Sequence, residues 1–317
     1  MTAGSFYLGT GHQSADQVHA VLDTFYETGG RDLDTARVYG DNEGHIGSWL
    51  RSRGVTDMRI LTKGGHPDIS GWQPPEPPDW KPRLDDAAIR ADIEQSLTDL
   101  GVASVESYLL HRDQLAKPIS EIAATLSSLV AEGLTRTIGV SNWRADRVAA
   151  LIAALDEQGG PPLAWVSNYF GLARAEGVLL IIGGKATTPG LIDLAEHHQF
   201  RILGYQARSF GFFDREERSD WEPFAADENR RRKAVLYEVA ARHDVDPSSL
   251  LTRWLITVHP KIVPVFGTRR PDHVRKLVQT AADESLDASA AELTEAVGGA
   301  WQDAGEFRAY GESGETA

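Results

Sequence analysis

Four residues that together can protonate a carbonyl group follow strand-like segments of the sequence. Asp34 ends the run RDLD, Lys63 follows RILT, His111 ends SYLLH, and Tyr39 lies shortly after Asp34. A cation within about 4–6 Å of a phenol stabilises the phenolate and lowers the phenol pKa. Lys63 is a candidate for that cation, with Asp34 as its counter-charge. With His111 as a hydrogen-bond donor to the carbonyl oxygen, the set needs no metal.

Each of these residues alone has an ordinary structural explanation. An aspartate after a strand is often a helix N-cap, and a histidine there is usually a hydrogen-bonded structural residue. Together they concentrate titratable groups in one concavity, which is typical of an active site. Lys63 could instead be a Schiff-base nucleophile, as in an aldolase, but the depressed pKa that this requires would be opposed by Asp34.

The elements that must position these residues alternate regularly along the chain. Short β-rich runs are followed by helical patterns eight times, as a parallel α/β architecture requires. The first helix begins with a capping box at Ser14 and Gln17 and ends at Gly29-Gly30. Eight βα units favour a closed barrel over an open doubly wound sheet, and no GxGxxG follows the first strand. Functional groups of such a barrel lie at the carboxyl ends of its strands.

We therefore expect one α/β domain over residues 1–317, a (β/α)8 TIM barrel with long loops after its strands. A polar, Gly-rich C-terminal tail is expected from about residue 298. The Pro-rich stretch 64–83 is expected to form a lid or a pocket wall. The segment 177–190 is an apolar excursion after the sixth strand, and the pattern does not assign it a role.

The composition argues against several classes of function. The net charge is −14 and cysteine is absent, so a disulfide framework, a thiolate nucleophile and a Cys-ligated zinc are excluded. The acidic balance without a basic stripe argues against nucleic-acid binding. No apolar run approaches the ~20 residues of a membrane span and no secretory signal is recognisable, so we expect a cytoplasmic protein. Neither a HExxH zinc motif nor a GxSxG serine-hydrolase elbow occurs, and we expect no metal.

The segment GGRDLDTARVYGDNEGHIGSWL (29–50) resembles the principal signature of the aldo-keto reductases. It contains the Asp-Thr-Ala, Tyr-Gly, Asn-Glu and Gly-x-x-Leu parts of that signature in order. The resemblance extends from about residue 6 to about residue 280, and it implies a (β/α)8 barrel that binds an extended NADPH without a Rossmann motif. Supporting matches are LGTG (8–11), ILTKGG (60–65), YLLHRD (108–113), IGVSNW (138–143), GYQARSFG (204–211) and VPVFGTRR (263–270).

The resemblance also implies a role for each of the four residues introduced first. Tyr39 would be the general acid, Asp34 and Lys63 would adjust its acidity, and His111 would position the carbonyl. Hydride would pass from the nicotinamide to the carbonyl carbon while Tyr39 protonates the oxygen. The expected function is therefore NADPH-dependent reduction of an aldehyde or ketone to an alcohol, with a small-molecule carbonyl compound as the partner.

The resemblance assigns the cofactor contacts to the ends of later strands. Ser141 and Asn142 would hydrogen-bond the nicotinamide carboxamide, and Tyr205 would stack on its ring. The GTRR stretch would hold the adenosine 2′-phosphate, because guanidinium groups suit phosphate recognition. Further cofactor contacts are expected from Thr10, Asp34, Ser167, Gln206, Ala207, Arg208, Gly267, Thr268, Arg269 and Arg270. Arg275 and Lys276 stand where the family commonly has a Glu-Asn pair at the adenine, and they add positive charge there.

The substrate pocket is expected to have aromatic walls, which suit bulky apolar carbonyl compounds and also stack on sugars. An alternative function is a slow-turnover, NADPH-binding regulatory subunit that resembles channel-associated β subunits. No partner-binding segment is recognisable, which favours the enzyme, and the oligomeric state is left open. The candidate wall residues are Trp72, Trp80, Trp143, Phe210 and Phe212.

Overall fold

The structure is a computed structural model, and it describes residues 5–7, 14–67, 81, 83–174, 184–214, 224 and 226–298. Thr10, Trp72 and Trp80 lie outside these ranges, as do residues 177–183 of the segment 177–190 and the expected tail beyond residue 298. The predictions made for them therefore stay predictions.

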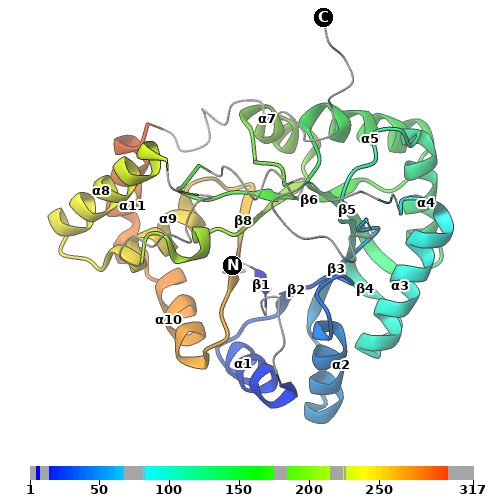
Figure 1. The fold of residues 1–317 in the computed structure, drawn as a ribbon, viewed down its shortest axis with the longest axis horizontal. Helices are drawn as coiled ribbons and strands as arrows, with labels where there is room; N and C mark the ends of the chain where they lie inside the picture. Colours follow the sequence, from blue (N-terminus) through cyan, green and yellow to red (C-terminus); the bar gives the residue numbers. More distant parts are fainter. Residues whose placement is uncertain are drawn as a thin grey trace, which may run out of the picture.

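Eight parallel strands close into a barrel, which confirms the predicted (β/α)8 architecture (Figure 1). Each strand pairs with the next along the chain, and the first strand also pairs with the last, which completes the circle. The strands are β1 (Ser5–Tyr7), β2 (Asp32–Asp34), β3 (Arg59–Gly64), β4 (Val105–Leu110), β5 (Thr135–Ser141), β6 (Leu163–Tyr169), β7 (Arg201–Tyr205) and β8 (Ile262–Gly267).

Helices surround the strands in a ring (Figure 1). Neighbouring helices pack on one another, and α1 packs on α10 where the first strand pairs with the last. Short 3-10 helices, η1 (Ser209–Gly211) and η3 (Glu284–Leu286), precede α8 and α11. The α-helices are α1 (Ala15–Glu27), α2 (Asn42–Arg53), α3 (Asp86–Leu100), α4 (Ile119–Ala131), α5 (Ala145–Glu157), α7 (Pro189–His198), α8 (Asp227–Arg242), α9 (Pro247–Thr257), α10 (Pro271–Ala281) and α11 (Asp287–Ala296).

Helix α1 shows how local sequence sets an element and its packing. The Ser14 hydroxyl accepts a hydrogen bond from the backbone N–H of Gln17 at 3.3 Å, and the Gln17 side chain accepts one from the Ser14 N–H at 3.1 Å. The predicted capping box is therefore confirmed. The apolar face at 3–4-residue spacing is buried against the barrel, as the periodicity predicts. Its residues are Val18, Val21, Leu22 and Phe25.

The barrel interior is filled by a small core of its own, and this core positions the site. It consists of Leu61, Leu109, Leu203, Val263 and Val265, with Trp165 packed against them. Successive side chains of a strand point to opposite faces, so a residue two positions later points the same way. The residues that follow this core by two positions therefore point into the mouth at the carboxyl ends of the strands. They are Lys63, His111, Ser167 and Tyr205.

Candidate active site

A buried ion pair joins the ends of β2 and β3. The Lys63 Nζ donates to Asp34 Oδ1 at 2.7 Å and to the backbone oxygen of Thr35 at 3.0 Å. The two side chains are only 3% and 5% exposed. Burial raises the pKa of Asp34 and lowers the pKa of Lys63, and the attraction between the two charges opposes both effects. The structure thus brings together the two residues that the sequence predicted as charge and counter-charge.

Polar contacts to β3 and to α2 fix the loop between β2 and α2, which carries Tyr39. The backbone N–H of Thr35 donates to Leu61 at 2.9 Å and that of Arg37 donates to Lys63 at 2.9 Å, so the loop continues the pairing of β2 with β3. The Arg37 guanidinium then contacts Glu43 at 2.9 Å, at the start of α2. Glu43 is fully buried and also accepts a hydrogen bond from the Thr62 hydroxyl at 2.6 Å.

Tyr39 lies between the ion pair and His111. Its ring meets the His111 ring edge-on at a centroid separation of 5.6 Å, and Lys63 Nζ lies 5.4 Å from the Tyr39 ring centroid. Burial raises the pKa of Tyr39 and the negative charge of Asp34 raises it further, whereas the positive charge of Arg112 lowers it. The Tyr39 pKa is therefore raised, not lowered as the sequence predicted, because burial outweighs the nearby positive charge. The phenol keeps its proton at neutral pH, as a proton donor must.

Two histidine rings meet edge-on beside Tyr39. The His66 and His111 rings have centroids 4.9 Å apart. His66 Nδ1 lies 2.8 Å from the Pro67 carbonyl oxygen and donates a hydrogen bond to it, because a carbonyl oxygen can only accept. Burial lowers the pKa of His111 well below its usual range and lowers that of His66 to about 4. The positive charge of Arg112 acts in the same direction on both. Both imidazoles are therefore neutral at neutral pH.

His66 and Arg112 also lie at this site, although the sequence pattern gave neither of them a role. Arg112 stands inside the quoted segment YLLHRD, directly after His111, and His66 directly follows the quoted segment ILTKGG. The sequence signal that could have found them is their position just after the end of a strand. A charged residue after a strand is usually solvated, however, and only the partial burial of its guanidinium in the folded chain sets Arg112 apart.

The expected carboxamide-binding residues come together at the ends of β5, β6 and β7. The Ser141 hydroxyl donates to the Ser167 carbonyl at 2.9 Å, and the Asn142 side-chain amide donates to Ser141 Oγ at 2.9 Å. The Tyr205 hydroxyl donates to Asn142 Oδ1 at 2.6 Å, and burial raises the pKa of Tyr205 to about 12. Asn142 has a φ of 63°, a left-handed conformation that such a network must hold in place and that often marks a functional site.

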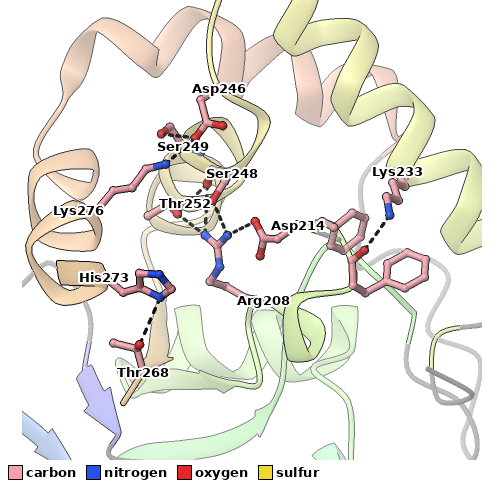
Figure 2. Close-up of polar contacts among 12 residues, drawn as sticks. Arg208, Asp214, Lys233, Asp246, Ser248, Ser249, Thr252, Thr268, His273 and Lys276 are labelled. Carbon is pink, nitrogen blue, oxygen red and sulfur yellow. Dashed lines mark hydrogen bonds and ion pairs between the residues drawn. The ribbon is translucent and has the colours of Figure 1, made fainter. Parts of the chain in front are cut away.

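The segment after β7 is fastened to α9 by Arg208 (Figure 2). The Arg208 guanidinium donates to Ser248 Oγ at 2.7 Å and to Thr252 Oγ1 at 2.5 Å, and it pairs with Asp214 at 2.5 Å. These contacts occupy the guanidinium with protein groups. The neighbouring expected cofactor residues are Gln206, which has a φ of 52°, and Ala207, which is 1% exposed.

The stretch expected to hold the 2′-phosphate leads into the N-terminus of α10 (Figure 2). Gly267, Arg269 and Arg270 are exposed there. The Thr268 hydroxyl accepts from the Arg270 backbone N–H at 3.2 Å, and the Arg270 guanidinium pairs with Asp272 at 2.6 Å. A helix N-terminus favours anions, which adds to the attraction of the arginines.

The positive charge expected farther along α10 is balanced locally. Lys276 pairs with Asp246 at 3.0 Å (Figure 2), and Arg275 pairs with Glu27 at 3.2 Å. Neither acidic partner is near in sequence, so the pattern gave no sign of this balance. These two residues therefore contribute less net charge toward a phosphate than the sequence suggested.

The aromatic residues predicted for the substrate pocket differ in exposure. Trp143 is completely buried in the hydrophobic core and Phe212 is 4% exposed, so neither presents free surface to a substrate in this structure. Phe210 is 54% exposed. Contact between these three residues and a substrate stays a prediction.

Residues 1–297 match the family model described as the Aldo/keto reductase family. The chain belongs to this family. Aldo-keto reductases are oxidoreductases, and this one carries their TIM-barrel fold. Among the described residues, none of the helices combines the length and the apolar character needed to cross a membrane. Nor does any group of three or more potential metal-binding side chains occur in that part of the chain.

Several characterised relatives of this aldo-keto reductase cover most of its length. It is 26% identical over 292 residues to methylglyoxal reductase DkgB of Salmonella typhimurium, which covers 91% of this chain and 90% of the relative. It is 24% identical over 306 residues to an aryl-alcohol dehydrogenase of Pestalotiopsis microspora, with 90% and 73% covered. A solved structure described provisionally as a 2,5-diketo-D-gluconic acid reductase B matches with a TM-score of 0.63 at 20% identity, covers 91% and 86% of the two chains, and has the same fold.

Proposed function

We propose that this aldo-keto reductase reduces an aldehyde or a ketone to an alcohol, with NADPH as the hydride donor and Tyr39 as the proton donor. The observation that carries the proposal is the meeting of Tyr39, the buried Asp34–Lys63 pair and the neutral His111 at the mouth of the barrel. The names of two relatives, a methylglyoxal reductase and an aryl-alcohol dehydrogenase, are consistent with this chemistry.

The residues around the mouth fit a nicotinamide dinucleotide. Buried side-chain atoms without a hydrogen-bond partner within the described part of the chain include Thr35 Oγ1, His111 Nδ1 and Gln206 Oε1, and such atoms call for a partner from outside the protein. Ser141, Asn142 and Ser167 would hold the carboxamide and Tyr205 the ring. Thr268, Arg269 and Arg270 would hold the 2′-phosphate. When bound, the nicotinamide supplies the hydride.

The side chains of the site would act on the carbonyl oxygen. The neutral His111 can donate a hydrogen bond to that oxygen and polarise the carbonyl. As the carbon accepts a hydride, negative charge develops on the oxygen, and Tyr39 gives it a proton. An alkoxide is a stronger base than a phenolate, so the transfer is favourable even though burial raises the Tyr39 pKa. Lys63, held by Asp34, and Arg112 then stabilise the phenolate that remains.

The Tyr39→Phe variant tests the proton donor directly. We expect kcat for aldehyde reduction to fall by about 10²- to 10⁴-fold, the usual contribution of a general acid, while the Kd for NADPH stays close to that of the wild type. The matched control is Tyr237→Phe, which removes a hydroxyl that donates to Phe213 outside the mouth. If Tyr39→Phe kept a wild-type kcat, Tyr39 would not be the acid.

A regulatory subunit is not favoured, because the relatives of this chain are named as reductases and dehydrogenases. Steady-state NADPH oxidation with a panel of aldehydes, ketosteroids and keto-sugars distinguishes the two functions. An enzyme oxidises NADPH in proportion to the added carbonyl compound. A regulatory subunit binds NADPH but shows almost no turnover with any of them.

A further inference from the structure

Arg112 is a cation at the mouth of the barrel, and none of the described carboxylates pairs with it. It follows His111 at the carboxyl end of β4. Its Nη1 donates to the His111 backbone oxygen at 2.8 Å, whereas its Nε is buried without any hydrogen-bond partner. Within the described part of the chain no carboxylate pairs with its guanidinium. Since an arginine is always charged in proteins, this site holds an uncompensated positive charge.

The described carboxylates nearest to Arg112 in the fold are already bonded to other groups. Asp113, the next residue, turns away and forms a two-pronged pair with Arg147, with both N–O distances at 3.0 Å. Asp34 is engaged by Lys63 at 2.7 Å. Further acidic groups behind β3 are likewise bonded, Glu43 to Thr62 and Arg37, and Asp92 to Arg83.

The mouth therefore contrasts with the rest of the protein in its charge. Among the described residues the mouth holds two cations, Lys63 and Arg112, but one carboxylate, Asp34, which pairs with Lys63. The whole chain, in contrast, has a net charge of −14. Removing an unpaired charge from water costs free energy, so a fold keeps one where a ligand or a reaction compensates it. The guanidinium lies close enough to Tyr39 and His111 for its charge to lower both of their pKa values.

We propose that the Arg112 guanidinium binds a carboxylate of the substrate, so that the preferred substrates are carbonyl acids that carry the carboxylate and the reducible carbonyl in one molecule. This inference rests on the proposed function, because both groups of the substrate meet the same site. A guanidinium pairs with a carboxylate through two parallel hydrogen bonds, which fixes orientation as well as affinity. The Arg112 side chain is half-buried, and within the described part of the chain its guanidinium makes one hydrogen bond, from Nη1, so donors remain for this pairing. The bound carboxylate leaves the carbonyl of the same molecule beside His111 and Tyr39.

Pairs of similar aldehydes, one with a carboxylate and one without, test this proposal. One pair is 4-carboxybenzaldehyde and methyl 4-formylbenzoate, and a second pair is succinic semialdehyde and butanal. We expect wild-type kcat/KM to favour the acid of each pair, and the acid-to-neutral ratio to fall about 10- to 100-fold in Arg112→Gln, mainly through KM. Loss of a cation near Tyr39 lowers kcat for both members of a pair, and the ratio removes that common effect.

Two further variants control for charge and geometry. Arg112→Lys keeps the positive charge but cannot form two parallel hydrogen bonds with a carboxylate. Its acid-to-neutral ratio should therefore lie between that of Arg112→Gln and that of the wild type. Arg136→Gln removes a 75% exposed arginine at the opposite end of the barrel, near the start of β5, and should leave the ratio unchanged. An unchanged acid-to-neutral ratio in Arg112→Gln would overturn the proposal. If the Kd for NADPH also rose in that variant, Arg112 would serve the cofactor instead.

Failure of the proposed function would look different from failure of this inference. If the wild type reduced neither member of either pair, the proposed function would fail. Calorimetric titration of benzoate against benzamide, each into wild-type protein and Arg112→Gln, would still decide the inference without any turnover. Selective benzoate binding that is lost in Arg112→Gln would support the anion site, and equal binding by both proteins would overturn it.

Discussion

The His66 imidazole should make the protein sensitive to acid. It is 8% exposed, and burial together with the charge of Arg112 lowers its pKa from 6.5 to about 4. The unfolded chain therefore binds a proton more readily than the folded one between these two values. The free energy of unfolding consequently falls as the pH falls through this window, and from about pH 7 to about pH 5 this one group should remove about 2 kcal/mol.

His66→Asn isolates this contribution, because the asparagine amide can still donate to the Pro67 carbonyl but does not titrate. We expect urea unfolding of the variant to show a smaller loss of stability between about pH 7 and about pH 5 than the wild type, by about 2 kcal/mol. His198→Asn, at an exposed position on α7, should leave the difference unchanged. An equal acid loss in His66→Asn and the wild type would contradict the assignment.

Residues differ in how well their sequence context predicts their place. Asp34, Lys63 and His111 could be predicted at one site because each ends a strand, and strands of one barrel end at the same rim. Arg112 could not, because its importance depends on where its neighbour Asp113 turns, and Asp113 pairs with Arg147 from a helix far along the chain. A pattern records which charges a chain carries, whereas pairing is a property of the packed structure.

The conformation of the loop between β2 and α2 should depend on Glu43. This carboxylate is fully buried, contacts Thr62 and Arg37, and so fixes the loop that carries Tyr39. In Glu43→Gln the hydroxyl of Thr62 keeps an acceptor, but Arg37 loses a charged partner. We expect a loss of about 1–2 kcal/mol in unfolding free energy. The displaced phenol should also lower kcat on the order of tenfold.

Urea unfolding and steady-state kinetics measure the two effects of Glu43→Gln separately. Asp99→Asn is the matched control, since Asp99 also pairs with Arg37, at 2.7 Å, but is 28% exposed. It should cost less stability and leave kcat near the wild-type value, because surface ion pairs contribute little. Equal effects of the two substitutions would show that Glu43 has no special role in holding the loop.

The elements themselves were largely predictable, because their ends carry local chemical signals. Helix α3 (Asp86–Leu100), for example, has Asp85 as its N-cap and Gly101 in a left-handed conformation at its end. The attachment of the segment after β7 was not predictable. It depends on hydrogen bonds from Arg208 to Ser248 and Thr252 on α9, and such a long-range contact leaves no periodicity in the sequence.

For the whole molecule, the distribution of charge matters more than its sum. A net charge of −14 repels a dinucleotide phosphate at long range, so recognition of the extra phosphate of NADPH must come from the local group at the start of α10. Within that group Arg270 pairs with Asp272 at 2.6 Å, and both side chains are exposed. Asp272 therefore competes with a bound phosphate for the same guanidinium, and removal of this competitor should strengthen phosphate binding.

Asp272→Asn tests whether this competition is local. We expect its selectivity for NADPH over NADH, measured as the ratio of kcat/KM, to rise about two- to fivefold, a size in keeping with an exposed ion pair. Asp227→Asn removes the same charge from the exposed Arg230–Asp227 pair on α8. Both variants change the net charge from −14 to −13, since each loses one of the 46 acidic residues. A rise in both variants would mean that overall charge governs selectivity, whereas a rise in Asp272→Asn alone assigns it to the Arg270 guanidinium.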